Sequence, residues 1–197
     1  MTTLEQHLKS FPYQIILGSA SPRRQELLKG LGFYFAVKPT HADESYPLEL
    51  RAEQIPLYLA KKKADAYNEE LKPHDLLITA DTIVWCEGKI YNKPSDFEEG
   101  EKMLSELSGK MHEVFTAVCL KSQDKQKLFV DASRVYFKKF TKQEIEYYLN
   151  NFKPYDKAGA YGVQDWLGYT GIEKIEGSFY TVMGLPVKLV YDELLKF

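Results

Sequence analysis

The segment that most constrains the fold is one in which a short apolar run turns directly into a helical pattern. Residues 13–18 (YQIILG) predict a buried strand, and residues 22–31 carry leucines at helical spacing. Residues 33–39 (FYFAVKP) predict a second strand. Strands and helices alternate in this way at first and a strand-rich middle follows, which indicates an α/β protein with a mixed sheet.

The rest of the chain gives weaker but consistent signals. The expected elements are a loop at 39–50, a helix at 51–70, a strand, a turn at 87–88 and a short strand within 76–94, a helix at 95–107, a hairpin from 111–122 and 127–140, a helix at 141–150, a Gly-rich stretch at 156–171, and a turn, a strand and a last helix within 175–195. The long helix should bury Ile55, Leu59, Ala60 and Ala66, and Ser95 should cap the helix after it.

Composition limits the class of protein. The chain has 197 residues, 44% of them hydrophobic and 27% charged, which suits one globular domain over 1–197, or one domain with two lobes, and no linker separates independent domains. The net charge of -2 gives no general attraction to nucleic acid or to an acidic membrane, so a bound anion needs a local cluster of donors.

Other features indicate a cytoplasmic protein. Cys86 and Cys119 are far apart and lack CxxC spacing, so we expect reduced, buried thiols. The first ten residues (MTTLEQHLKS) lack the apolar region of a signal peptide, and no apolar run is long enough to span a bilayer.

The turn between the first strand and helix carries an anion-binding pattern. Ser21 can cap the helix and Pro22 suits its first position. The helix N-terminus offers unpaired N–H groups, and Ser19, Arg23 and Arg24 add donors that match phosphate oxygens. The alternative is an ordinary capped helix with solvated arginines, although positive charge in a first turn opposes the helix dipole.

Further charged and polar residues are candidates for the same site. Asp81 follows a buried apolar run, where a carboxylate needs a partner or a metal. Lys93 precedes a proline in a rigid turn, and the Gln164 amide can donate and accept at one base edge. Each has a plainer explanation as a salt-bridged, solvated or loop-capping residue. Lys61, Lys62 and Lys63 cannot all point the same way on one helix.

Seven segments together resemble the Maf family of nucleoside triphosphate pyrophosphatases, in the order of that family and over nearly the whole chain. They are LGSASPRRQELL at 17–28, LAKKKA at 59–64, ADTIVW at 80–85, NKPSD at 92–96, MLSELSGKMHEVFTAV at 103–118, DKAGAYGVQ at 156–164 and IEGSFYTVMGLPV at 175–187. The resemblance implies hydrolysis of a nucleoside triphosphate to the monophosphate and pyrophosphate. It also implies an elongated fold similar to the inosine triphosphate pyrophosphatases, with the site in a cleft between two lobes.

The resemblance also implies roles for particular residues. Asp81 matches the catalytic carboxylate and Lys93 the lysine of the KP turn. Glu44, with Asp81, would hold a divalent metal, Mg²⁺ or Mn²⁺. The substrate-binding positions are Ser19, Arg23, Arg24, Lys63, Thr82 and Gln164.

The segment at 159–164 is similar to the branch of the family that takes dTTP and UTP. A uracil or thymine edge alternates acceptor, donor and acceptor, which one amide can meet. The branch that takes 7-methyl-GTP tends to have an acidic residue at the position of Gln164. Residues 165–171 (DWLGYTG) have no place in the family pattern.

Other functions stay open at this point. They are a 7-methyl-GTP pyrophosphatase of the same family, and a non-catalytic nucleotide-binding regulator of septum formation. The complete set of charged residues argues against the regulator. A nucleic-acid-binding protein is disfavoured because the sequence has no basic stripe. The family is also compatible with a homodimer.

Overall fold

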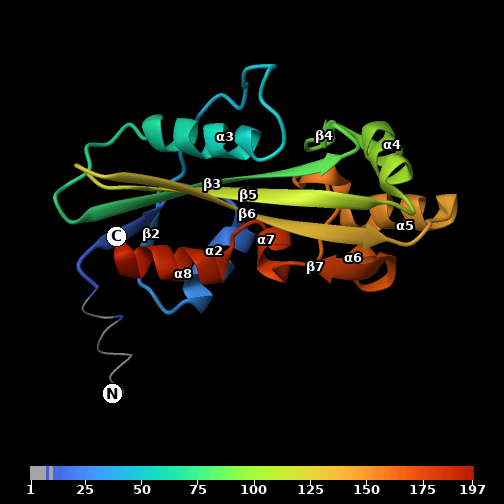
Figure 1. Cartoon of the computed structure of the whole chain (residues 1–197). Helices are drawn as coiled ribbons and strands as arrows, with labels where there is room; N and C mark the ends of the chain where they lie inside the picture. Colours follow the sequence, from blue (N-terminus) through green and yellow to red (C-terminus); the bar gives the residue numbers. More distant parts are fainter. Residues whose placement is uncertain (1–7, 9–10) are drawn as a thin grey trace. The chain divides into compact units, whose positions relative to one another are not determined.

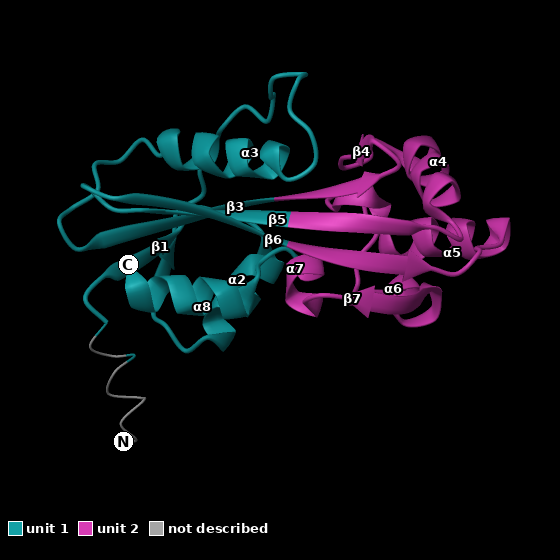
Figure 2. Cartoon of the chain, in the orientation of Figure 1, with its two compact units in different colours: residues 1–81, 116–131, 184–197 teal, residues 82–115, 132–183 magenta. Residues whose placement is uncertain are grey.

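The computed structural model describes residue 8 and residues 11–197. The prediction that the first ten residues are not a signal peptide concerns a segment that, apart from residue 8, lies outside the described residues. The chain divides into two compact units, shown in separate colours in Figure 2. Unit 1 contains residues 1–81, 116–131 and 184–197, and unit 2 contains 82–115 and 132–183. The backbone passes between the units four times, so neither is one continuous stretch of sequence.

Figure 1 shows the helices and strands. In chain order they are β1 (Gln14–Leu17), α2 (Pro22–Gly30), β2 (Phe35–Val37), α3 (Gln54–Asp65), β3 (Asp75–Cys86), β4 (Lys89–Tyr91), α4 (Phe97–Leu107), β5 (Met111–Lys121), β6 (Gln126–Phe137), α5 (Lys142–Phe152), the 3-10 helix η1 (Ala158–Ala160), α6 (Trp166–Gly171), β7 (Ile172–Glu176), α7 (Phe179–Met183) and α8 (Val187–Lys196).

The strands form a mixed sheet, as the sequence predicted. The strand order is β2-β1-β3-β5-β6-β7, and β4 pairs with β3. β1 runs parallel to β2 and to β3, with Ile16 opposite Ala36 on one side and Leu77 on the other. β4 and β7 run antiparallel to their neighbours β3 and β6. The α/β class is therefore confirmed.

Unit 1 has helices on both faces of its part of the sheet (Figure 2), with α3 on one face and α2 and α8 on the other. α3 packs through Ala60 and Ala64 against Ile16, Leu77 and Cys119 of the strands. Small residues on the helix allow this close approach, and burial of the apolar surface fixes the helix over β3.

Unit 2 has its own apolar core. It contains Leu104 and Leu107 of α4, Tyr148 and Leu149 of α5 and Val84 of β3, all nearly or fully buried. α4 begins with two acidic residues and α5 with a capping box, in which Thr141 and Glu144 bond reciprocally.

Two local predictions are confirmed. Ser21 caps α2, its side chain accepting from the backbone N–H of Arg24, and Pro22 is the first helical residue. Glu87 and Gly88 join β3 to β4 with φ values of 49° and 81°, the left-handed conformation that a tight hairpin turn requires.

α3 is shorter than the predicted helix over 51–70. Pro56 has no N–H and must lie in the first turn, so the helix cannot begin as early as residue 51. Ala52, two residues before the start of α3, has a left-handed backbone conformation with φ of 43°. Ile55, Leu59 and Ala60 are buried as expected. Ala66 is not on the inner face, because the helix has ended at Asp65 and Ala66 is exposed.

Two further predictions are wrong. Asp96, not Ser95, caps α4, because Glu99 donates its N–H to Asp96 while its carboxylate accepts from the N–H of Ser95. The strand expected within 175–195 is the short helix α7, which Gly177 and Gly184, both at positive φ, enclose. The strand that pairs with β6 is β7, over Ile172–Glu176.

Both cysteines are free and buried, in agreement with the sequence analysis. Burial raises the pKa of the Cys119 thiol to about 11, so the group is a protonated, unreactive thiol at neutral pH. Among the described residues, every helix is either too short or too polar to span a bilayer.

Candidate functional site

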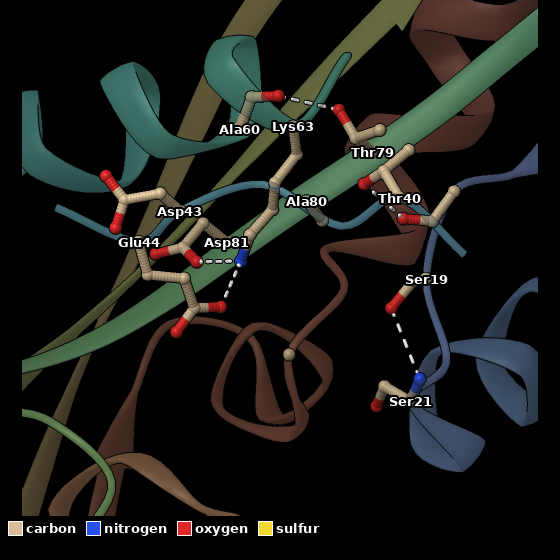
Figure 3. A network of polar contacts seen from close by, with 12 residues as sticks. Ser19, Ser21, Thr40, Asp43, Glu44, Ala60, Lys63, Thr79, Ala80 and Asp81 are labelled. Carbon is tan, nitrogen blue, oxygen red and sulfur yellow. Dashed lines mark hydrogen bonds and ion pairs between the residues drawn. The ribbon is translucent and has the colours of Figure 1, made fainter. Parts of the chain in front are cut away.

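The centre of the candidate site is one lysine held between two carboxylates (Figure 3). The Lys63 ammonium lies 2.6 Å from Oδ1 of Asp81 and 2.9 Å from Oε1 of Glu44. The side chains of Lys63 and Asp81 are 14% and 10% exposed, whereas that of Glu44 is 50% exposed. One carboxylate is therefore buried and the other reaches solvent.

The periodicities of β3 and α3 bring these groups together. Thr79 and Asp81 are two residues apart in β3 and so lie on one face of the strand. Ala60 and Lys63 are three apart on α3 and share one helix face. Thr79 donates its hydroxyl to the carbonyl of Ala60 at 2.7 Å. Asp81, two residues later on β3, pairs with Lys63, which is three residues later on α3.

A second lysine, Lys62, holds the loop that carries Glu44. Its ammonium bonds the Asp43 carboxylate at 3.0 Å and the Ser45 carbonyl at 2.8 Å, on either side of Glu44. Ser45 also donates its N–H to Asp43 at 3.1 Å, which closes a tight Asx turn. Lys61 points elsewhere, to Asp65. The sequence analysis did not single out Lys62, because nothing in the sequence links the DES triplet at 43–45 to the lysine run at 61–63.

The strand-to-helix turn after β1 forms another part of unit 1's polar cluster. Ser19 is buried, and its hydroxyl oxygen accepts from the N–H of Ser21 at 3.3 Å and from Arg24 Nη1 at 3.4 Å. Gly18, the residue before Ser19, is closely surrounded by other side chains. A Cβ at Gly18 would lie 2.8 Å from Thr79 Cγ2. Glycine is thus required for the chain to reach Ser19 in this position.

Arg24 is bound into the fold rather than extended into solvent. Nε donates to the carbonyl of Gly184 and Nη1 to that of Ala80, both at 2.8 Å. The second bond holds the residue that precedes Asp81. Arg23, half-buried, lies beside it in the first turn of α2. That either guanidinium binds phosphate stays a prediction.

Burial controls the electrostatics of the cluster. It raises the pKa of Asp81, and the nearby ammonium of Lys63 opposes this effect without reversing it. Burial also lowers the pKa of Arg24, against the attraction of Asp81. Asp43 behaves oppositely: bonds from Ser45 and then Lys62 lower its pKa to about 2.

The other predicted site residues belong to unit 2. Thr82 follows Asp81 in β3 and is half-buried, on the opposite face of the strand. Lys93 is exposed, between β4 and α4, and the proline after it is buried. Gln164 lies between η1 and α6, and its side-chain oxygen is buried without a hydrogen-bond partner among the described residues.

Asp81 and Glu44 also fit the predicted metal. No group of three or more His, Cys, Asp and Glu side chains in the described part of the chain is arranged to bind a metal by itself. Mg²⁺ needs only one or two carboxylates when a substrate supplies phosphate oxygens. Two carboxylates that already share one cation, the Lys63 ammonium, meet that requirement.

These features define a class: an α/β protein in which a partly buried carboxylate–lysine cluster lies near the N-terminus of a helix that begins with Pro22, Arg23 and Arg24. A profile of the family described as Maf-like protein matches residues 14–197, so the chain belongs to that family.

Similar proteins include three bacterial relatives named dTTP/UTP pyrophosphatase. The relative from Bacteroides thetaiotaomicron is 52% identical and covers 93% of this chain and 96% of its own. The relative from Bacteroides fragilis is 50% identical and covers 92% of this chain and 95% of its own. The relative from Porphyromonas gingivalis is also 50% identical and covers 94% of this chain and 94% of its own.

Among solved structures, the Staphylococcus aureus Ham1 protein is 14% identical, with a TM-score of 0.44 over 63% of this chain and 71% of its own.

Proposed function

We propose that this protein hydrolyses dTTP and UTP to the nucleoside monophosphate and pyrophosphate. The observation that carries the proposal is the carboxylate pair of Asp81 and Glu44 held on one lysine, in a chain about half identical to relatives named for this reaction. Acid groups with a nearby lysine are what a phosphoanhydride hydrolase needs to activate water and balance phosphate charge.

Asp81 is the proposed catalytic carboxylate. It is proposed to accept the proton of the attacking water and, with Glu44, to hold the metal. Its raised pKa supports the first role, because a base works best when its pKa approaches the working pH. Lys63, whose ammonium binds both carboxylates, is placed to form an ion pair with a phosphate oxygen as charge develops there.

We further propose that Mg²⁺ or Mn²⁺ is the cofactor and that Asp81 with Glu44 holds it. The metal supplies charge neutralisation on the phosphates and a lower pKa for bound water. The hydroxyl of Ser19 and the guanidinium groups of Arg23 and Arg24, with Lys93, are the proposed donors to the triphosphate.

Gln164 is the residue proposed to recognise the base, together with Thr82. A buried amide oxygen that lacks a protein donor is costly, and a ligand N–H offsets that cost. The N3–H of uracil or thymine is such a donor, while N3 of cytosine is an acceptor and cannot fill the role.

The test is hydrolysis of dTTP, UTP, CTP, 7-methyl-GTP, ATP and GTP by the purified protein with Mg²⁺ or Mn²⁺, with product identification. We expect monophosphate and pyrophosphate from dTTP and UTP. The Asp81→Asn variant should lose most turnover while Asp43→Asn, in the loop beside it, keeps most of it. Wild-type activity in Asp81→Asn would remove Asp81 from the mechanism.

Two other outcomes would overturn the proposal. Cleavage of 7-methyl-GTP alone would keep the chemistry and change the base. Absence of turnover for all six nucleotides, with nucleotide binding retained, would favour the non-catalytic regulator.

The proposed setting is the cytoplasm, without a nucleic-acid partner. The two free, buried thiols and the net charge of -2 support it. A homodimer is an expectation from the family, and light scattering of the purified chain tests it.

A further inference from the structure

The segment that carries Gln164 is closely packed within unit 2. A Cβ at Gly162 would lie 2.4 Å from Oδ2 of Asp165, and one at Gly168 would lie 2.0 Å from the carbonyl oxygen of Val163. A larger residue at Gly168 would have to move the backbone of Val163, next to Gln164, and one at Gly162 would have to displace the Asp165 side chain. The segment is therefore built to present this side chain in one place.

One hydroxyl group joins the two sides of this segment. Tyr148 of α5 donates to Oδ2 of Asp165 at 2.9 Å and accepts from the N–H of Gly162 at 3.0 Å. Gly162 is two residues before Gln164 and Asp165 is the residue after it. The Tyr148 side chain thus acts as a brace across the turn that holds Gln164.

Tyr148 cannot act by touching substrate, because it is fully buried. Burial also raises the pKa of its phenol, so the group stays a neutral donor throughout the physiological range. Its partner Asp165 lies 3.6 Å from the Lys157 ammonium, which also bonds Asp156 at 2.8 Å. The Asp165 carboxylate therefore links α5 to the start of the same segment.

The segment is also tied to the turn that carries Lys93. Gly159 donates its N–H to the carbonyl of Asn92, the residue before Lys93, at 3.1 Å. Gly159 has a left-handed backbone and lies against Val84, which leaves no space for a side chain. A displacement of the segment would therefore reach Lys93 as well as Gln164.

We propose that Tyr148 and Asp165 are positioning residues that set base selectivity by fixing the amide of Gln164. This inference rests on the proposed function, because selectivity is measured on dTTP and UTP hydrolysis. Loss of the brace leaves the Gly162 N–H without its acceptor and lets the Gln164 amide take several orientations. Binding is then weakened for the substrates whose base donates a hydrogen bond to the amide oxygen.

The experiment compares kcat and KM for dTTP, UTP and CTP in three variants and a control. Tyr148→Phe and Asp165→Ala should lower kcat/KM for dTTP and UTP by about tenfold or more, mainly through KM. The value of kcat/KM for CTP should fall less, so the ratio of kcat/KM for dTTP to kcat/KM for CTP should become smaller. Asp165→Asn keeps an oxygen acceptor for Tyr148 and should retain most of the wild-type ratio.

Tyr147→Phe is the matched control, since Tyr147 is the neighbouring residue on α5 and is half-exposed. It should keep wild-type values. If Tyr148→Phe does not fold, the inference is tested by comparing the dTTP to CTP ratio of kcat/KM in Asp165→Ala with that in Asp165→Asn. An unchanged dTTP to CTP ratio in folded Tyr148→Phe, or in folded Asp165→Ala, would overturn the inference while wild-type dTTP hydrolysis upholds the proposed function. Absence of wild-type dTTP hydrolysis would overturn both.

Discussion

Replacement of Asp81 by Asn should make the folded protein more stable at neutral pH while it removes activity. The reason is the direction in which folding moves the pKa: burial raises the pKa of Asp81 even though Lys63 pairs with it. The folded state thus favours the protonated carboxyl. Asparagine has the size of that form and keeps an oxygen that can accept from Lys63.

The sign and magnitude follow from proton linkage. A carboxyl whose pKa rises on folding favours the folded state most below its unfolded pKa of about 3.9 and loses this contribution as pH rises through the folded pKa. A pKa that rises by one pH unit corresponds to about 1.4 kcal/mol. The advantage of Asp81→Asn should be smallest near pH 3.5 and should grow as pH rises through the folded pKa. Above that pKa it is worth roughly 3–6 °C in Tm for each pH unit by which the pKa rises.

Urea unfolding of both proteins from pH 3.5 to 8 measures this difference. Asp43→Asn is the control with the opposite sign, because the pKa of Asp43 falls to about 2 on folding. Its contribution is present above the unfolded pKa and lost as pH falls, so this variant should be less stable than wild type at neutral pH. If Asp81→Asn is less stable than wild type at pH 7, pairing with Lys63 outweighs burial and the argument is wrong.

Three other predictions concern unit 2 and the metal. Gly159→Ala should cost about 1–3 kcal/mol more in urea unfolding than Gly88→Ala, since both glycines have positive φ but only Gly159 meets a neighbour, Val84 at 3.0 Å. Equal costs would show that the contact with Val84 is unimportant. Lys93→Met should lower kcat/KM for dTTP by at least about tenfold, whereas Lys89→Met in the adjacent strand should not. Treatment with EDTA should abolish turnover and added Mg²⁺ should restore it; turnover that persists in EDTA would exclude the metal.

The parts of this fold that sequence could predict are those with local causes. Ser21 and Pro22 mark the start of α2 because a cap and a fixed φ act within one turn. The turn at Glu87 and Gly88 is equally local. The carboxylate Asp81 stood out because a charge after a buried run needs a partner, whatever that partner is.

What could not be predicted depends on residues far apart in sequence. Arg24 bonds carbonyl groups 56 and 160 residues away, and no local sequence pattern indicates these two contacts. The segment after Gly177 has β-branched and aromatic residues typical of a strand, yet β7 already pairs with β6 and this segment folds as α7. Tertiary pairing here outweighs local propensity.

The bond from Arg24 to the Gly184 carbonyl also has a consequence for biosynthesis. A ribosome adds about 5–20 residues per second, so roughly 10–30 s pass between the emergence of these two partners. During that interval the nascent polypeptide holds the turn of Ser19 and Arg24 without its last acceptor. The proposed triphosphate site therefore lacks this bond until translation has almost finished, and we expect that a chain arrested before residue 184 does not hydrolyse nucleoside triphosphates.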